Sequence, residues 1–181
     1  MVQWKKIPVT IGFGGISSLC ILLFTIGTWR GGTEVFIGNI AYAMYLIPVV
    51  FAIVAALVEK RRRQGVLGFR PALTICFGII VLSLAVQRVF TWILVHLIDP
   101  AFGRTLGPAV LANTEAAYRR FGMPEDEIST NIAAAKNSDP FGFGSMALGL
   151  AYTYVLFFLI AVLLAAIIRR NSPAEGPYKK S

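Results

Sequence analysis

Four long apolar stretches constrain this chain more than any other feature of its sequence. They lie at about residues 7–29, 37–58, 71–97 and 146–168, and together they hold a single charged residue. A helix of about 20 residues crosses the ~30 Å hydrocarbon core of a bilayer, so each stretch predicts a transmembrane helix. Only 14% of the residues are charged, against about 25% in a soluble domain. We therefore expect an all-α integral membrane protein in which residues 1–170 form one four-helix bundle.

The basic residues are sorted between the two ends of these predicted helices. If the amino terminus is cytoplasmic, the cytoplasmic segments hold eleven basic residues against two acidic ones, and the outer segments hold five against seven. Lysine and arginine near helix ends stay on the cytoplasmic side during insertion. Both termini are therefore expected in the cytoplasm, with a mobile tail at residues 171–181 and an outer loop at residues 98–145. This topology accounts for the net charge of +8, so no nucleic-acid partner is expected.

The outer loop is too polar to cross the bilayer, but it carries helix signals of its own. Small and apolar residues alternate with a polar face over residues 100–121, and Gly122 is placed to end a helix there. A proline and three acids at residues 124–127 suit the first turn of another helix, because acids favour the positive end of the helix dipole. Lys136 suits its last turn. We expect two short amphipathic helices lying against the outer surface of the membrane.

Small residues in two of the apolar stretches mark predicted helix contacts, because small side chains let helix backbones approach closely in lipid. A spacing of four residues puts each set on one helix face: Gly14 and Ser18 in the first stretch, and Ser145, Gly149 and Thr153 at the start of the fourth. Pro48 removes a backbone donor within the second stretch, so a kink is expected there.

Arg88 is the one charged residue inside an apolar stretch. A charge within a membrane span is costly and indicates function by default. Counted along the predicted helices, a set of polar and aromatic side chains lies at a similar depth and would line a small pocket opening outward around it: Gln87, Asn39, Tyr42, Tyr45, Tyr152 and Tyr154. Alternatively, the Arg88 side chain extends to the surface and pairs with Asp99 or Glu34. The sequence leaves both interpretations open.

A second candidate site is the basic hairpin between the second and third stretches. It consists of Lys60, Arg61, Arg62, Arg63 and Arg70. Such a cluster beside a membrane helix can bind anionic lipid headgroups or receive a cytosolic partner. Alternatively, the only role of this cluster is to keep the hairpin on the cytoplasmic side of the membrane.

The chain carries no residue set typical of an enzyme or a metal site. His96 is the only histidine and has no cysteine beside it, so neither a zinc site nor another cofactor is expected. No nucleophile–base pair stands at a predicted membrane boundary, so no catalytic residue is expected.

Five stretches together carry a family resemblance. They are the end of the second apolar stretch at residues 52–63, the hairpin at 65–69, the exit turn IDPAF at 98–102, the loop segment FGMPEDE at 121–127, and the end of the fourth stretch at 165–170. Their order and spacing resemble the bacterial membrane family designated domain of unknown function 4199. The resemblance implies a four-helix protein of the cytoplasmic membrane in bacteria that also have an outer membrane, with the outer loop in the periplasm. It implies no activity and no site residues.

These observations favour a non-enzymatic accessory or scaffold subunit that acts through membrane lipids, another membrane protein or a cytosolic enzyme. Two alternatives stay open. One is a small transporter or channel whose outward pocket surrounds Arg88 and takes an anionic or lipid-headgroup ligand. The other is a lipid-handling partner of a glycosyltransferase that uses a polyprenyl-phosphate substrate. The oligomeric state stays undecided.

Overall fold

The computed structural model describes residues 8–136 and 141–169, which form helices joined by short turns and contain no β-strand. The tail predicted at residues 171–181 lies outside the described residues. In chain order the elements are α1 (Val9–Arg30), α2 (Thr33–Ile37), the 3-10 helix η1 (Asn39–Tyr45), α3 (Leu46–Arg62), α4 (Phe69–Ile93), the π-helical turn η2 (Leu94–Ile98), α5 (Pro100–Arg120), α6 (Glu125–Lys136) and α7 (Phe143–Ile168).

Four helical segments are long and apolar enough to cross a membrane. They are Val9–Arg30, Tyr42–Arg62, Phe69–Ile98 and Phe143–Ile168. The prediction of an all-α fold with four such helices is confirmed.

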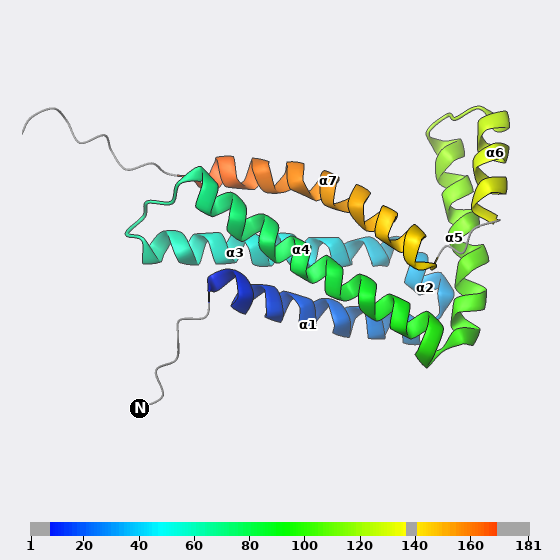
Figure 1. Cartoon of the computed structure of the whole chain (residues 1–181), viewed down its shortest axis with the longest axis horizontal. Helices are drawn as coiled ribbons and strands as arrows, with labels where there is room; N and C mark the ends of the chain where they lie inside the picture. Colours follow the sequence, from blue (N-terminus) through cyan, green and yellow to red (C-terminus); the bar gives the residue numbers. More distant parts are fainter. Residues whose placement is uncertain (1–7, 137–140, 170–181) are drawn as a thin grey trace, which may run out of the picture.

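The central element of the bundle is α4, which packs against α1, α3 and α7 (Figure 1). α1 also packs against α3, whereas α7 lies mainly along α4 and touches α3 only slightly. The buried residues on α3 are largely alanines: Ala52, Ala55 and Ala56. Such small side chains let the helix backbones approach closely and pack by dispersion.

The inward face of α1 is made of small and polar residues. Their spacing alternates between four and three residues, which keeps them on one side of the helix: Gly14, Ser18, Ile21, Thr25 and Thr28. A Cβ atom on Gly14 would lie 2.8 Å from Leu82 Cδ2 of α4, so the contact predicted there is confirmed. The buried Ser83 Oγ of α4 donates a hydrogen bond to Ser17 Oγ of α1 at 2.9 Å. Apart from the buried Ile21, several large apolar residues of α1 lie on its exposed side, as expected when lipid replaces water around a bundle: Ile11, Ile16, Leu19 and Leu23.

The predicted contact through the small residues at the start of α7 is wrong. Ser145 is exposed, and a Cβ atom on Gly149 would meet no atom within 4 Å. α7 packs instead through its second half, where Phe157, Ala161 and Ala165 are buried. Small residues permit close approach but supply little dispersion contact themselves, so the larger interlocking surface decides where two helices meet. The first half of α7 is therefore free to border cavities.

The second span also differs from the prediction, because it is not one α-helix kinked at Pro48. Its first part is the 3-10 helix η1, and α3 begins at Leu46, so Pro48 is the third residue of a new helix. Proline suits the first turn of a helix, where a backbone N–H has no helical partner to lose.

The loop between α4 and α7 forms a hairpin of two helices across one end of the bundle (Figure 1). The Asp99 carboxylate begins α5: its Oδ1 accepts a hydrogen bond from the Phe102 N–H at 3.0 Å. Its Oδ2 accepts one from Trp29 Nε1 at 3.2 Å, which ties α5 to the end of α1. A Cβ atom on Gly103 would lie 2.9 Å from the Val95 carbonyl oxygen, so only glycine lets α5 turn this tightly against η2. We call this end of the molecule the α5 end.

The hairpin bends at Gly122, whose φ of 73° lies in the left-handed region that favours glycine. α6 packs against α5 and buries Ile128 and Ile132 there. Its apolar face is therefore used against protein. That α5 and α6 lie on a membrane surface stays a prediction.

Candidate functional site

Arg88 lies on α4 one helical turn before Trp92 and is half-buried. In the described part of the chain its guanidinium forms neither an ion pair nor a hydrogen bond. The two partners that the sequence suggests are not used: Asp99 begins α5 and holds Trp29, and Glu34 is exposed on α2. Arg88 is therefore a cation within an apolar helix that the described protein does not neutralise.

Beside Arg88 is a cavity of about 380 Å³, which we call the outer chamber. Four of the residues predicted from the sequence line it together: Arg88 and Gln87 from α4, and Tyr42 and Tyr45 from η1. Gln87 and Thr91 are linked on α4 by a hydrogen bond of 3.1 Å from Nε2 to Oγ1, so part of the wall is polar.

The remaining residues of the predicted pocket lie elsewhere. Tyr152 is 70% exposed and does not line the chamber. Tyr154 donates a hydrogen bond from its hydroxyl to the Val81 carbonyl at 3.0 Å and so joins α7 to α4. The side chain of Asn39 lies outside what the structure describes.

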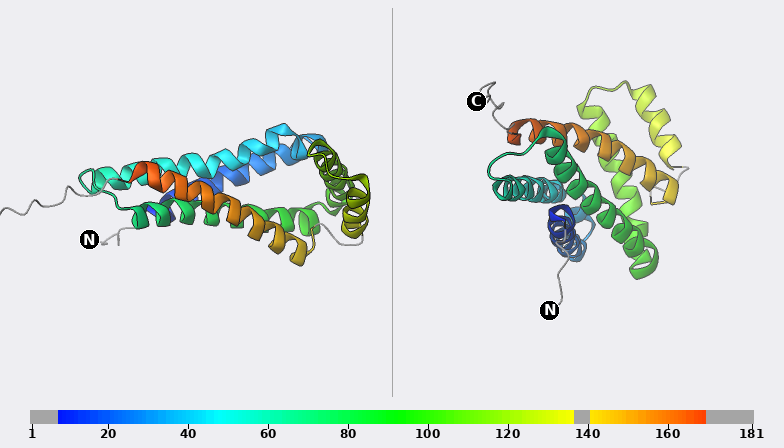
Figure 2. Two further views of the ribbon diagram at one scale, coloured as in Figure 1. Left: turned by 90° about the horizontal axis from the view of Figure 1, so that it is seen from above. Right: turned by 60° about the vertical axis from the view of Figure 1, so that its left-hand side comes forward.

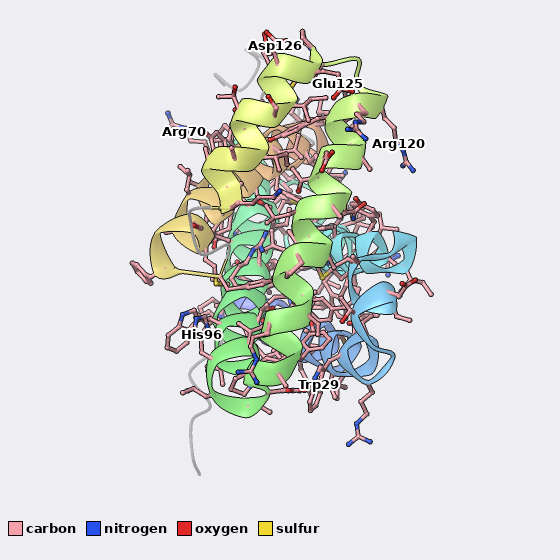
Figure 3. The ribbon with its side chains drawn as sticks, turned by 90° about the vertical axis from the view of Figure 1, so that its right-hand side faces the viewer. Trp29, Arg70, His96, Arg120, Glu125 and Asp126 are labelled. Atoms are coloured by element: carbon pink, nitrogen blue, oxygen red, sulfur yellow. The ribbon has the colours of Figure 1, made fainter. Side chains whose placement is uncertain are left out.

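α5 forms the roof of the chamber. That this helix lies close to Arg88 was not predicted from the sequence. Leu106, Val110, Asn113, Thr114 and Ala117 of this helix line the cavity. Figure 3 looks onto this end and shows α5 crossing it from Trp29 towards Arg120 and Glu125. The Asn113 side chain donates a hydrogen bond to the Ile37 carbonyl at 3.2 Å, which fastens α5 to α2. The polar face of α5 was visible in the sequence, but its position over α4 is a tertiary feature.

A second cavity, of about 460 Å³, lies between α4 and the first half of α7, and we call it the apolar groove. Apart from Arg88, its lining consists only of apolar side chains: Ala85, Val89 and Trp92 from α4, and Phe143, Met146, Ala147 and Leu150 from α7. Arg88 and Met146 line both the groove and the outer chamber. The surface of the groove is wholly apolar, so Arg88 borders it with the carbon atoms of its stem, and the two cavities are neighbours on either side of this side chain.

The basic hairpin lies at the opposite end of the bundle, where α3 passes into α4 (Figure 2). Lys60 Nζ donates a hydrogen bond to the Ile168 carbonyl at 2.7 Å and so caps the end of α7. Arg63, the residue after the end of α3, pairs through Nε with Glu59 Oε1 of α3 at 2.8 Å. Both interactions are internal to the fold.

The remaining arginines of the hairpin divide into two groups. Arg62 and Arg70 line, with Arg63, a cavity of about 550 Å³ beside the start of α1. Arg61 is exposed and lies outside that lining. The cluster predicted as one surface thus consists of one structural lysine and a smaller set of available arginines.

Comparison with known proteins assigns the chain to a family. The family described as "Protein of unknown function (DUF4199)" matches residues 10–170. No curated protein and no solved structure matches the chain. The matched range includes the four long helices except for the first residue of α1, together with the α5–α6 hairpin and both candidate sites. The resemblance noted from the exit turn at residues 98–102 and the loop segment at 121–127 is confirmed, and the chain belongs to the DUF4199 family.

Proposed function

We propose that this chain is a non-enzymatic protein of a bacterial cytoplasmic membrane whose outer chamber binds an anionic group. α1, α3, α4 and α7 cross the bilayer, and the α5 end faces the periplasm. Two observations support this placement. Large apolar side chains are exposed along these helices, and the arginines at the end of α3 lie opposite the α5–α6 hairpin.

The observation that carries the binding role is the uncompensated charge of Arg88 at the wall of a roofed cavity. A guanidinium in a membrane span is costly unless it is paired or hydrated. An anion in the chamber would supply the missing partner through charge-assisted hydrogen bonds, which arginine makes in a two-pronged geometry to carboxylate and phosphate. The cavity of about 380 Å³ is within the range of about 300–1,000 Å³ typical of small-ligand sites.

A binding role is favoured over a channel because the packed bundle closes the space beyond the chamber. The next buried polar side chains along α4 and α1, Ser83 and Ser17, hydrogen-bond to each other within a close helix contact. Towards the basic hairpin the space between α3, α4 and α7 is filled by fully buried apolar side chains such as Ala52, Ile79 and Ala161. An ion would have to cross this packed layer without a ligand.

The binding role is tested by native mass spectrometry of the purified protein in mild detergent. The probes are phosphatidylglycerol, which is anionic, and phosphatidylethanolamine with the same chains, which is zwitterionic. Wild type should prefer the anionic lipid about 10- to 100-fold, because a hydrogen bond to a charged group contributes about 1.5–3 kcal/mol. Arg88→Gln should abolish the preference, and Arg104→Gln, an exposed arginine on α5, should retain it. Equal retention of both lipids by wild type, or an unchanged preference in Arg88→Gln, would refute the proposal.

The proposed orientation is tested separately by thiol labelling with a membrane-impermeant reagent. Phe121→Cys, at an 87% exposed position beside the bend of the α5–α6 hairpin, should react in intact cells. Gln64→Cys, exposed in the turn between α3 and α4, should react only after the membrane is permeabilised. Cys20 is half-buried and Cys76 buried, so the unmodified chain is the background control. The reverse pattern would invert the topology and remove the outer chamber from the periplasmic side.

A second candidate function is that of an accessory subunit, and the exposed end of the α5–α6 hairpin favours it. Among the helices that the structure describes, α6 contacts only α5, and the tip of the hairpin exposes Phe121. Apart from Ile128 and Ile132, most side chains of α6 are exposed, so this hairpin is open to contact with another membrane protein. Purification in mild detergent should then recover a second protein at fixed stoichiometry, and Phe121→Ser should release it.

A further inference from the structure

We propose that the occupant of the outer chamber is an anionic lipid, held with its headgroup at Arg88 and one hydrocarbon chain in the apolar groove between α4 and α7. This inference rests on the proposed function, since it assigns a ligand class to the same site. It also assigns a role to the groove, which the binding of an anion alone does not require.

The first argument is the way the two cavities join. The outer chamber has a partly polar wall, the groove has an apolar one, and they share Arg88 and Met146. A ligand that fills both must be polar or charged in the chamber and hydrocarbon in the groove. An anionic lipid has this arrangement, whereas a soluble anion would leave the groove empty.

The second argument concerns how such a ligand would enter. α5 roofs the chamber but does not pack against α7 in the described part of the chain. The first half of α7 leaves open space on the side of Gly149, while Leu150 and Tyr154 pack against the bundle. The lining of the groove includes Phe143, which is 84% exposed. A lipid could therefore move sideways from the bilayer into the groove without opening the helix bundle.

The third argument is depth. Arg88 lies closer to the α5 end than to the basic hairpin, because the apolar segment Phe69–Ile98 has its midpoint between residues 83 and 84. At about 1.5 Å per residue Arg88 is about 7 Å beyond that midpoint, which is about 8 Å inside the edge of a ~30 Å hydrocarbon core centred there. Its long side chain can extend towards a headgroup while its stem remains among hydrocarbon. Trp92 stacks on His96 at 4.9 Å between ring centroids and occupies the interfacial depth typical of tryptophan.

The proposal that the groove holds a lipid chain is tested by a substitution that fills the groove. Ala147 lies on the exposed side of α7 and lines the groove, so Ala147→Trp should occupy the space of the chain. Ala166→Trp places the same side chain at an exposed position near the other end of α7 and is the matched control. With phosphatidylglycerol as the probe in native mass spectrometry, Ala147→Trp should lose bound lipid to the level of Arg88→Gln. Ala166→Trp should retain it, and glycerol 3-phosphate in large excess should not displace the lipid from wild type.

A second measurement uses the unaltered chain and so does not depend on the folding of a variant. Phosphatidylglycerol with a photoreactive group in its chain should crosslink within residues 85–92 and 143–150. Crosslinks confined to the exposed faces of α1, or unchanged binding in Ala147→Trp, would overturn the groove assignment.

The outcomes separate this inference from the proposed function. If Arg88→Gln loses the lipid but Ala147→Trp does not, the chamber binds an anion and the groove assignment is wrong. The same conclusion follows if glycerol 3-phosphate displaces the lipid. If neither variant changes binding, both proposals fail. A dimer of the chain that carries no lipid and dissociates in Ala147→Trp would show that a second copy covers the groove, which also overturns the inference.

Discussion

Replacing Arg88 by leucine should stabilise the bundle, because the guanidinium has no protein counter-ion among the described residues. The apolar segment Phe69–Ile98 has its midpoint between residues 83 and 84, so Arg88 lies about 7 Å from the middle along the helix axis. A charged side chain at the centre of a membrane helix costs about 2.5–3.5 kcal/mol on insertion scales. Towards the boundary, and beside a chamber that can hold water, we take about half of this cost. Arg88→Leu should therefore raise the free energy of unfolding by about 1–2 kcal/mol.

The assay is thermal unfolding of delipidated protein in a mild detergent. For a chain of 150–250 residues, 1 kcal/mol corresponds to about 2–4 °C, so Arg88→Leu should unfold about 2–8 °C above wild type. Arg104→Leu removes an exposed arginine of α5 and should change stability by no more than about 0.5 kcal/mol. Such a gain in stability with a loss of lipid binding is the pattern expected of a residue kept for function. Unfolding of Arg88→Leu below wild type would refute the reasoning, because it would show that the guanidinium holds the helices together.

The remaining predictions concern contacts that hold the bundle. A double-mutant cycle of Ser17→Ala and Ser83→Ala should give a coupling energy of about 0.6 kcal/mol, the average for buried polar pairs between membrane helices; strictly additive effects in reversible unfolding would contradict the hydrogen bond at 2.9 Å. Lys60→Met should weaken the end of α7 by about 0.3–1 kcal/mol, because the ammonium no longer meets the Ile168 carbonyl at the negative end of the helix dipole. Hydrogen exchange in the last two turns of α7 should then be faster in Lys60→Met than in Arg61→Met, and equal rates would rule out the cap.

The α5–α6 hairpin shows how far local signals predict this fold. Proline at the first position of α5, Gly122 after its end and three acids at the start of α6 are local features, and the observed bounds agree with them. The apolar pair Ile128 and Ile132 was visible as one face of a helix. The sequence did not show which surface would cover this face, because the membrane, the helix bundle and α5 are equally suitable apolar partners. In the structure that partner is α5.

The sequence predicted those features of the candidate site that depend on how far along each long helix a residue lies. Counting residues along four spans placed Arg88, Gln87, Tyr42 and Tyr45 at one level, and they do share a cavity. Depth does not specify the direction in which a side chain points, which is why Tyr152 was placed in the pocket but is largely exposed.

By itself the sequence determined the four helices that are long and apolar enough to cross a membrane, the ends of α5 and α6, and the sorting of charged residues between the ends of the long helices. These follow from length, hydropathy and helix-end chemistry, which act within a few turns of the chain. Only the tertiary structure decided that Arg88 has no ion-pair partner among the described residues, that Lys60 caps α7, and that α5 roofs a chamber beside the apolar groove. Each of these depends on which faces of distant helices meet, and in an apolar surrounding many pairs of faces are nearly equal in energy until all helices are packed together.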